Sequence, residues 1–140
     1  MCGLTYSGHP LACAAGIATL DVYKEEKLVE RSKAMGKILG QIEEELKRKH
    51  PCVGDVRYKG LFSAIELVKD KETKEPLVEY NKDPENIMGG NIGVLKKKGF
   101  STYSHENNII VAPPLIITET ELRDAMAIMD EVLADVDAMI

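Results

Sequence analysis

A polar loop close to the start of the chain holds the residues that could do chemistry. Hydroxyl groups stand at Thr5 and Ser7, Gly8 leaves the backbone unobstructed, and Pro10 suits the first turn of a helix. Because the N-terminal end of a helix carries partial positive charge, hydroxyls beside it can bind an anion such as a phosphate group. The same residues could instead only cap the helix, with Ser7 or His9 as the capping side chain.

Cys13 and His9 suggest a second chemistry, because a neighbouring imidazole can hold a cysteine as the nucleophilic thiolate. Pro10 lies between them, so we expect His9 just outside the helix. A cysteine among alanines is more often a small buried hydrophobic residue. We therefore favour packing for Cys13 over a Cys–His hydrolase.

Neither a metal site nor a disulfide framework is predicted. The three histidines lie far apart and no acidic pair stands near them at a metal-ligand spacing. The three cysteines are an odd number without a CxxC pair, which fits a reducing compartment. The histidines are His9, His50 and His105, and the cysteines are Cys2, Cys13 and Cys52.

Charge and hydropathy exclude several classes of partner. The 18 basic and 23 acidic residues give a net charge of −5, and the basic residues form no stripe, so we expect no nucleic-acid partner. No apolar stretch is long enough to span a membrane, and the first residues do not resemble a signal peptide. We expect a cytoplasmic protein with no membrane partner.

The pattern of apolar residues predicts alternating helices and strands. The expected elements are helices over 10–23 and 27–49, strands over 53–58 and 61–68, a helix over 84–95, strands over 100–103 and 109–112, and a helix opened by a Thr118–Glu121 capping box. This order predicts an α/β (α+β) fold, a two-layer sandwich in which helices cover a small, mostly antiparallel sheet of about four short strands.

Small residues raise two further expectations about packing. The first helix is alanine-rich, so we expect it to lie buried against a neighbouring element. Gly89, Gly90 and Gly93 match neither a dinucleotide fingerprint nor a phosphate-binding loop, and we favour close packing as their role.

Four stretches, in this order, resemble the C-terminal portion of class III (omega-type) pyridoxal-phosphate-dependent aminotransferases of the type I fold. They are "TYSGHPLACAAGIATLDVYKEE", "VGDVRYKGLFSAIELV", "GVLKKKGFSTYSHENNIIVAPPLIIT" and "TETELRDAMAIMDEVL". The resemblance implies that residues 1–26 form a cofactor-phosphate loop and interface helix leading in from the large domain. It implies that residues 27–140 form the C-terminal small domain.

The resemblance assigns a role to the polar loop. In that family the threonine of a T-[YF]-x-G-[HN]-P loop hydrogen-bonds the phosphate of pyridoxal 5'-phosphate (PLP) in the partner subunit of a homodimer. Thr5 matches it, with Tyr6 and Ser7 beside it. The family's cofactor-bearing lysine lies upstream of this loop, so we expect no catalytic residue in this chain and no activity from the chain alone.

The resemblance also places "APPL" near the substrate entrance, which makes Ile110, Pro113 and Pro114 candidate neighbours of the substrate. Many members carry an arginine for the substrate α-carboxylate where this chain has Ile110. An apolar side chain cannot make that contact. An amine or amino acid donor with a 2-oxo acid acceptor is therefore expected, with amines and omega-amino acids favoured. Arg57 matches a family arginine, and we expect it to brace strand and turn.

A function from another class is the alternative. The chain could be a stand-alone, non-catalytic α/β ligand-binding or interaction module that keeps the aminotransferase-like scaffold. The two hypotheses differ in whether a large domain of about 250 or more residues is encoded upstream.

Overall fold

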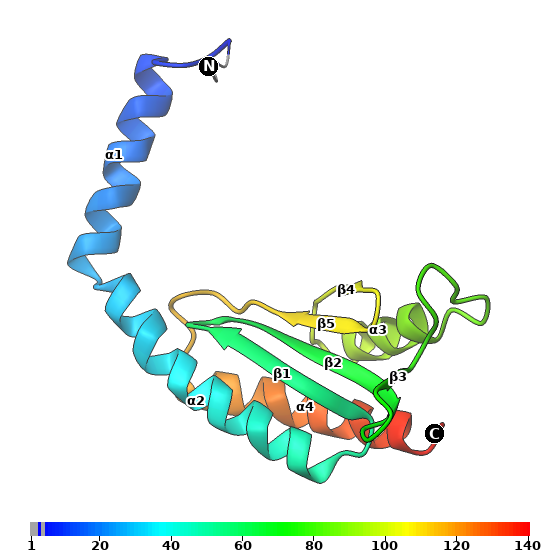
Figure 1. The fold of residues 1–140 in the computed structure, drawn as a ribbon. Coiled ribbons are helices and arrows are strands. Elements are labelled where there is room, and N and C mark those ends of the chain that lie inside the picture. The colour runs from blue at the N-terminus through cyan, green and yellow to red at the C-terminus, as the bar shows by residue number, and fades with distance from the viewer. Residues whose placement is uncertain (1–2, 4) are drawn as a thin grey trace.

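A small antiparallel sheet carries helices against one of its faces (Figure 1). The computed structural model describes residue 3 and residues 5–140. Strands β1 (Val53–Lys59) and β2 (Phe62–Asp70) form a hairpin, and β5 (Asn108–Val111) and β4 (Ser104–His105) complete the order β1-β2-β5-β4. A two-residue strand, β3 (Glu75–Pro76), pairs with the end of β2. The predicted antiparallel sheet is confirmed, with β3 as an unpredicted addition.

Three residues at the start of the sequence, Met1, Cys2 and Leu4, lie outside the described residues. For the cysteines, the structure can therefore be compared with the sequence only at Cys13 and Cys52. Both Cys13 and Cys52 are free thiols, the first exposed and the second buried.

The first helix stands apart from the rest of the molecule. Helix α1 (Pro10–Glu25) extends away from the sheet and meets α2 (Leu28–Lys49) at Lys27, whose backbone is left-handed with φ of 49° (Figure 1). All residues of α1 are exposed. The prediction that this helix is buried is wrong for the chain as it stands, because no other element of residues 5–140 covers it.

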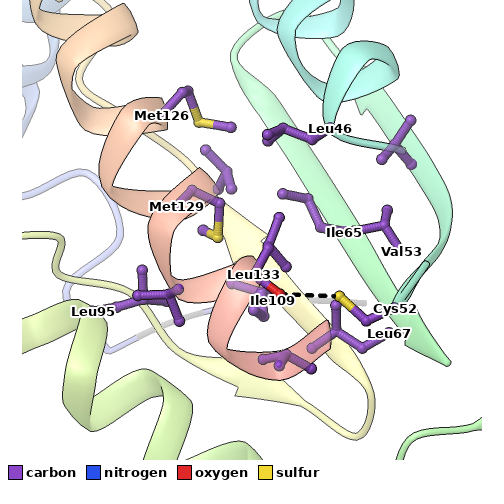
Figure 2. Packing of buried hydrophobic residues seen from close by; sticks show 14 of the residues in the cluster. Leu46, Cys52, Val53, Ile65, Leu67, Leu95, Ile109, Met126, Met129 and Leu133 are labelled. Atoms are coloured by element: carbon purple, nitrogen blue, oxygen red, sulfur yellow. Dashed lines mark hydrogen bonds between the residues drawn. The ribbon is translucent and has the colours of Figure 1, made fainter. Parts of the chain in front are cut away.

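The core lies between the sheet and the two long helices α2 and α4 (Glu119–Asp137). Figure 2 shows Met126, Met129 and Leu133 of α4 pointing toward the sheet, where Ile65 and Leu67 of β2 meet them. These five side chains are at most 2% exposed. The predicted apolar face of the last helix is confirmed, and the capping box at its start is present, with Thr118 and Glu121 each accepting from the other's backbone N–H.

Helix α3 (Ile87–Lys97) begins three residues later than predicted. The Asp83 carboxylate accepts hydrogen bonds from the N–H groups of Ile87 and Met88, at 2.7 and 2.9 Å. Asn86 precedes the helix with a left-handed φ of 52°. Pro84 suggested the earlier start. The helix instead begins where the Asp83 carboxylate accepts hydrogen bonds from its first free N–H groups.

The strand predicted over 100–103 is wrong. Gly99 takes a left-handed φ of 95°, and the Phe100 N–H donates to the Leu95 carbonyl at 2.9 Å. These bonds finish α3 in the manner of a glycine C-cap, so Phe100 belongs to the helix end. The strand that pairs with β5 is β4, where Ser104 lies opposite Ile109.

The glycines of α2 are closely packed, whereas two glycines of α3 have open space around them. A methyl group placed on Gly36 would lie 2.4 Å from the Gly60 carbonyl oxygen, and one on Gly40 would lie 2.2 Å from the Tyr58 ring. Gly90 and Gly93 of α3 have nothing within 4 Å. Close packing, predicted for α3, is therefore wrong for those two positions. It applies instead to α2, whose backbone rests on the β1–β2 turn.

One carboxyl group is enclosed in the same contact. Glu43 of α2 is fully buried, and the Ser63 hydroxyl of β2 donates to its Oε1. Its Oε2 has no hydrogen-bond partner among the described residues. Burial raises the pKa of Glu43 to about 7, against the lowering effect of the Ser63 bond.

A polar cluster joins the C-terminal ends of α2 and α4. The buried His50 ring contacts Asp137 through Nδ1 at 2.6 Å and Asp130 through Nε2 at 2.8 Å. Asp137 also accepts from the Cys52 N–H at 2.9 Å. The hydrogen bond from Lys49 comes first among the causes that lower the pKa of Asp130. The cluster closes the core at the end opposite the β1–β2 turn.

The close approach at Gly36 gives a matched pair of substitutions. Gly36→Ala should lower the free energy of unfolding by about 1–3 kcal/mol, because the added methyl group meets the Gly60 backbone. Gly93→Ala should raise it by up to about 1 kcal/mol, because alanine has the higher helix propensity and the site is open. Urea unfolding measures both. A Gly36→Ala protein as stable as the wild type would contradict the seating of α2.

Glu43 predicts how stability depends on pH. With its pKa raised from 4.5 to about 7 by folding, the carboxyl binds its proton more tightly in the folded state. The contribution of this group to the free energy of unfolding should be largest below pH 4.5. It should fall by about 3 kcal/mol as the pH rises to 7. Glu43→Gln should remove this fall, as measured by urea unfolding at pH 4 and 7. Glu45→Gln, on the exposed side of α2, is the control and should leave the fall in place.

Candidate functional site

The polar loop forms a turn directly before α1. The His9 N–H donates to the Tyr6 carbonyl at 3.1 Å, and Gly8 has a left-handed φ of 76° that suits glycine. Thr5, Tyr6 and Ser7 are exposed. His9 is the N-cap residue, but its side chain makes no capping bond, which excludes it as the predicted cap. Pro10 is the first helical residue, as predicted.

The chemistry of this loop fits a phosphate group. The hydroxyls of Thr5 and Ser7 and the N-terminal end of a sixteen-residue helix are neutral or partly positive donors. The left-handed turn at Gly8 brings the chain into the helix without a side chain between them. The loop is therefore a suitable place for the phosphate of a cofactor, with Thr5 and Ser7 as the side chains that would hold it.

The loop lies far from the second group of candidate residues. A helix of sixteen residues is about 24 Å long, and α1 separates the loop from the sheet by this length (Figure 1). The second group belongs to the sheet domain, with Ile110 on β5 and Pro113 and Pro114 just after it. The structure of one chain does not bring the two groups together.

Cys13 lies on α1 and is exposed, so the prediction that it is buried is wrong. The Cys13 N–H donates to the His9 carbonyl at 2.9 Å as part of the helix. His9 makes its ring contact with Tyr6, with ring centroids 6.0 Å apart. No contact in the described part of the chain joins the Cys13 thiol to this imidazole, and the geometry offers no support for a Cys–His nucleophile.

Ile110 lies on the open face of the sheet. Its neighbours Ile109 and Val111 are buried toward the helices, and alternation along a strand turns Ile110 the other way, where it is half-buried. Strand register puts Ile110 opposite Ala64 of β2, and Ala64 opposite Arg57 of β1. The three residues therefore form one row across the open face.

Arg57 in this row contacts polar side chains of three strands. Its guanidinium contacts Asp55 at 3.1 Å, Glu66 of β2, and the Asn108 side chain of β5 at 2.6 Å. The hydrogen bond to Glu66 comes first among the causes that raise the pKa of Arg57. The predicted bracing role is seen here as a tie across three strands.

Pro113 and Pro114 lie in the segment between β5 and α4. They form part of the wall of a pocket of about 220 Å³, together with Phe100, Ile117 and Ile128. The pocket lies between this segment, the end of α3 and the first half of α4, and Val111, the last residue of β5, also lines it. Ile110 does not line it.

Sequence reasoning missed the residue that holds this segment in place. Arg31 of α2 donates to the carbonyl oxygens of Leu115, Ile116 and Ile117. Nothing in the sequence marks this arginine, because its acceptors are backbone atoms that lie 84 to 86 residues away.

The described residues form neither a metal-binding cluster nor a membrane-spanning helix. Residues 3 and 5–140 contain no group of three or more histidine, cysteine or acidic side chains that could hold a metal ion. Within the same residues, the longest helices lack the apolar length that crossing a bilayer requires.

Comparison with known proteins identifies the class of this chain. The model of the class III aminotransferases matches residues 2–133, so the chain belongs to that family. An ethanolamine-phosphate phospho-lyase homolog from Caenorhabditis elegans is 36% identical over 132 residues, which are 92% of this chain and 27% of the relative. A taurine–pyruvate aminotransferase from Bilophila wadsworthia is 35% identical over 134 residues, 95% of this chain and 29% of the relative.

Solved structures agree with the sequence comparison. The taurine:2-oxoglutarate aminotransferase of Bifidobacterium kashiwanohense, solved with PLP and glutamate, superposes with a TM-score of 0.91 at 44% identity. The match covers 99% of this chain and 31% of that one. This chain thus has the fold of one part of a class III aminotransferase, and it spans less than a third of the length of these relatives.

Proposed function

We propose that this chain is the C-terminal part of a PLP-dependent aminotransferase that transfers an amino group from an amine or amino acid donor to a 2-oxo acid. The observation that carries the proposal is the family match over residues 2–133, which includes the Thr5 loop and the Pro113–Pro114 segment. Residues 1–26 are the phosphate loop and interface helix, and residues 27–140 are the small domain. The enzyme acts as a cytoplasmic homodimer.

The Thr5 loop serves the partner subunit in this proposal. The support is geometric, because α1 holds the loop about 24 Å beyond the sheet and away from Pro113 and Pro114. A loop so placed can reach a second subunit more readily than the substrate side of its own. When bound, PLP is the electron sink for the reaction at the amine carbon. The hydroxyls of Thr5 and Ser7 would donate to its phosphate, with Tyr6 beside them.

The open face of the sheet supports a donor without an α-carboxylate. Ile110 brings no charge to the row that it shares with Ala64 and Arg57. Arg57 already pairs with the carboxylates of Asp55 and Glu66, which offset its charge, and its other terminal nitrogen donates to Asn108. A carboxylate approaching Ile110 would find no bidentate partner in this row. Amines and omega-amino acids therefore fit best.

Thr5 provides a direct test of the phosphate contact. Thr5→Val keeps the shape and removes the hydroxyl, so the full-length gene product should bind PLP about tenfold or more weakly, as expected for a lost bond to a charged group. Cofactor titration followed by absorbance measures this. Thr120→Val, on the exposed first turn of α4 and outside both the loop and α1, is the matched control and should bind PLP as the wild type does. Equal PLP affinity of the Thr5 variant and the wild type would contradict the contact.

A donor panel tests the reaction. With pyruvate or 2-oxoglutarate as acceptor, the full-length gene product should use taurine or 4-aminobutyrate, donors named for relatives of this chain, at least about tenfold better than L-alanine by kcat/KM. A strict preference for α-amino acids would contradict the donor class. Phosphate release from ethanolamine phosphate would indicate a lyase instead. No turnover of any amine would favour the non-catalytic ligand-binding or interaction module.

A further inference from the structure

Arg31 makes an unusual set of contacts for a residue in the first turn and a half of a helix. Its Nε donates to the Leu115 carbonyl at 3.1 Å, and one terminal nitrogen donates to the carbonyls of Ile116 and Ile117 at 3.0 and 2.7 Å. Three successive carbonyl oxygens thus converge on one guanidinium. The side chain is half-buried between α2 and the segment that precedes α4.

The segment held by Arg31 has few other partners for its backbone. Residues 112–118 join β5 to α4 and belong to no strand or helix. Polar backbone groups that leave a sheet need new partners when they are half-buried. The Ile117 N–H donates to the Pro114 carbonyl at 3.0 Å, which closes a turn, and Arg31 takes up the carbonyl groups.

Geometry makes this contact specific to arginine. The guanidinium is planar and presents several N–H groups in a fixed fork, so it can fix the relative directions of neighbouring carbonyls. A lysine ammonium has one nitrogen and cannot span the same set. The positive charge also lies near the start of α4. It adds to the hydrogen bonds from Thr118, the larger cause, that lower the pKa of Glu121.

The fixed segment determines where Pro113 and Pro114 stand. Both prolines have a restricted φ, so little backbone freedom is left between them and the turn that ends at Ile117. Pro113, Pro114 and Ile117 all line the 220 Å³ pocket. When the carbonyls of residues 115–117 move, the proline pair must move with them.

We propose that Arg31 is a positioning residue for the substrate side of the enzyme, acting through the carbonyls of residues 115–117 on Pro113 and Pro114. This inference rests on the proposed function, in which the proline pair borders the substrate. Loss of the contact loosens one wall of the site without removing a group that takes part in the reaction. The KM for the amine donor should therefore rise more than kcat falls.

Hydrogen exchange on the 140-residue chain tests the contact without reference to activity. In Arg31→Met the Ile117 amide should exchange about tenfold or more faster, because the turn that it closes loses three charge-assisted bonds. Arg31→Lys keeps the charge and should still exchange faster than the wild type. Arg123→Met is the control, because the hydrogen bond and ion pair of Arg123 go to the Glu119 side chain of its own helix, and its Ile117 amide should exchange at the wild-type rate. An unchanged rate in both Arg31 variants would overturn the proposal.

Kinetics of the full-length gene product test the role. With the better of taurine and 4-aminobutyrate as donor, Arg31→Lys should raise the donor KM about tenfold and lower kcat by less than about threefold, while PLP affinity stays unchanged. Faster exchange at Ile117 with unchanged KM and kcat would overturn the positioning role. A wild-type enzyme that transaminates no donor would instead contradict the proposed function, and the substrate role with it. The exchange result would still decide whether Arg31 holds the segment.

Discussion

The close seating of α2 on the β1–β2 turn is the constraint on which the rest of the small sheet domain depends. Gly36 and Gly40 lie on the helix face that meets Gly60 and Tyr58, with no room for a methyl group at either glycine. This contact fixes the distance of α2 from the sheet and the rotation of α2 about its own axis. One turn and a half earlier along the helix, the same rotation directs Arg31 toward the segment before α4. The segment with Pro113 and Pro114 is thus placed by α2, which the length of α1 separates from the Thr5 loop.

The same seating explains why a carboxyl group is buried in the core. Glu43 lies almost one turn after Gly40 on the face that meets β2, so a helix held this close encloses it. The Ser63 hydroxyl offers one partner, and the pKa near 7 follows from the missing solvent. About two turns further along, directly after α2 ends, His50 and two aspartates contact one another.

Much of the fold could be predicted from the sequence, because the signals for its helices and central strands are local. Apolar spacing and a capping box located α4, and Pro10 marked the start of α1. The errors arose where a contact with a distant segment, or a hydrogen bond at a helix end, determines the local structure. Phenylalanine is typical of strands, yet the Phe100 N–H donates to the Leu95 carbonyl and completes the end of α3. Gly36 and Gly93 are indistinguishable in sequence, and only the neighbour across the interface separates them.

The candidate site was predictable only in part, for the same reason. The Thr5 loop was found because its residues are contiguous, and the Pro113–Pro114 segment because it is a short motif. Arg31 was not found, because its role depends on carbonyl groups more than eighty residues away, and any residue type can supply a carbonyl. A residue that acts through the backbone of another segment leaves no pattern of side chains to recognise.

Helix α1 shows how the two parts of the proposed site come to depend on different partners. Over residues 11–20 its large apolar side chains, Leu11, Ile17 and Leu20, are between 59% and 74% exposed, and the small residues between them leave no charged face in this part of the helix. A helix that is apolar on all sides is stable when it is enclosed. The small domain has its own core, but the position of the Thr5 loop is set by whatever encloses α1. In the proposed homodimer, cofactor binding and subunit association are therefore coupled through this one helix, whereas the substrate-side segment is held by Arg31 within the chain.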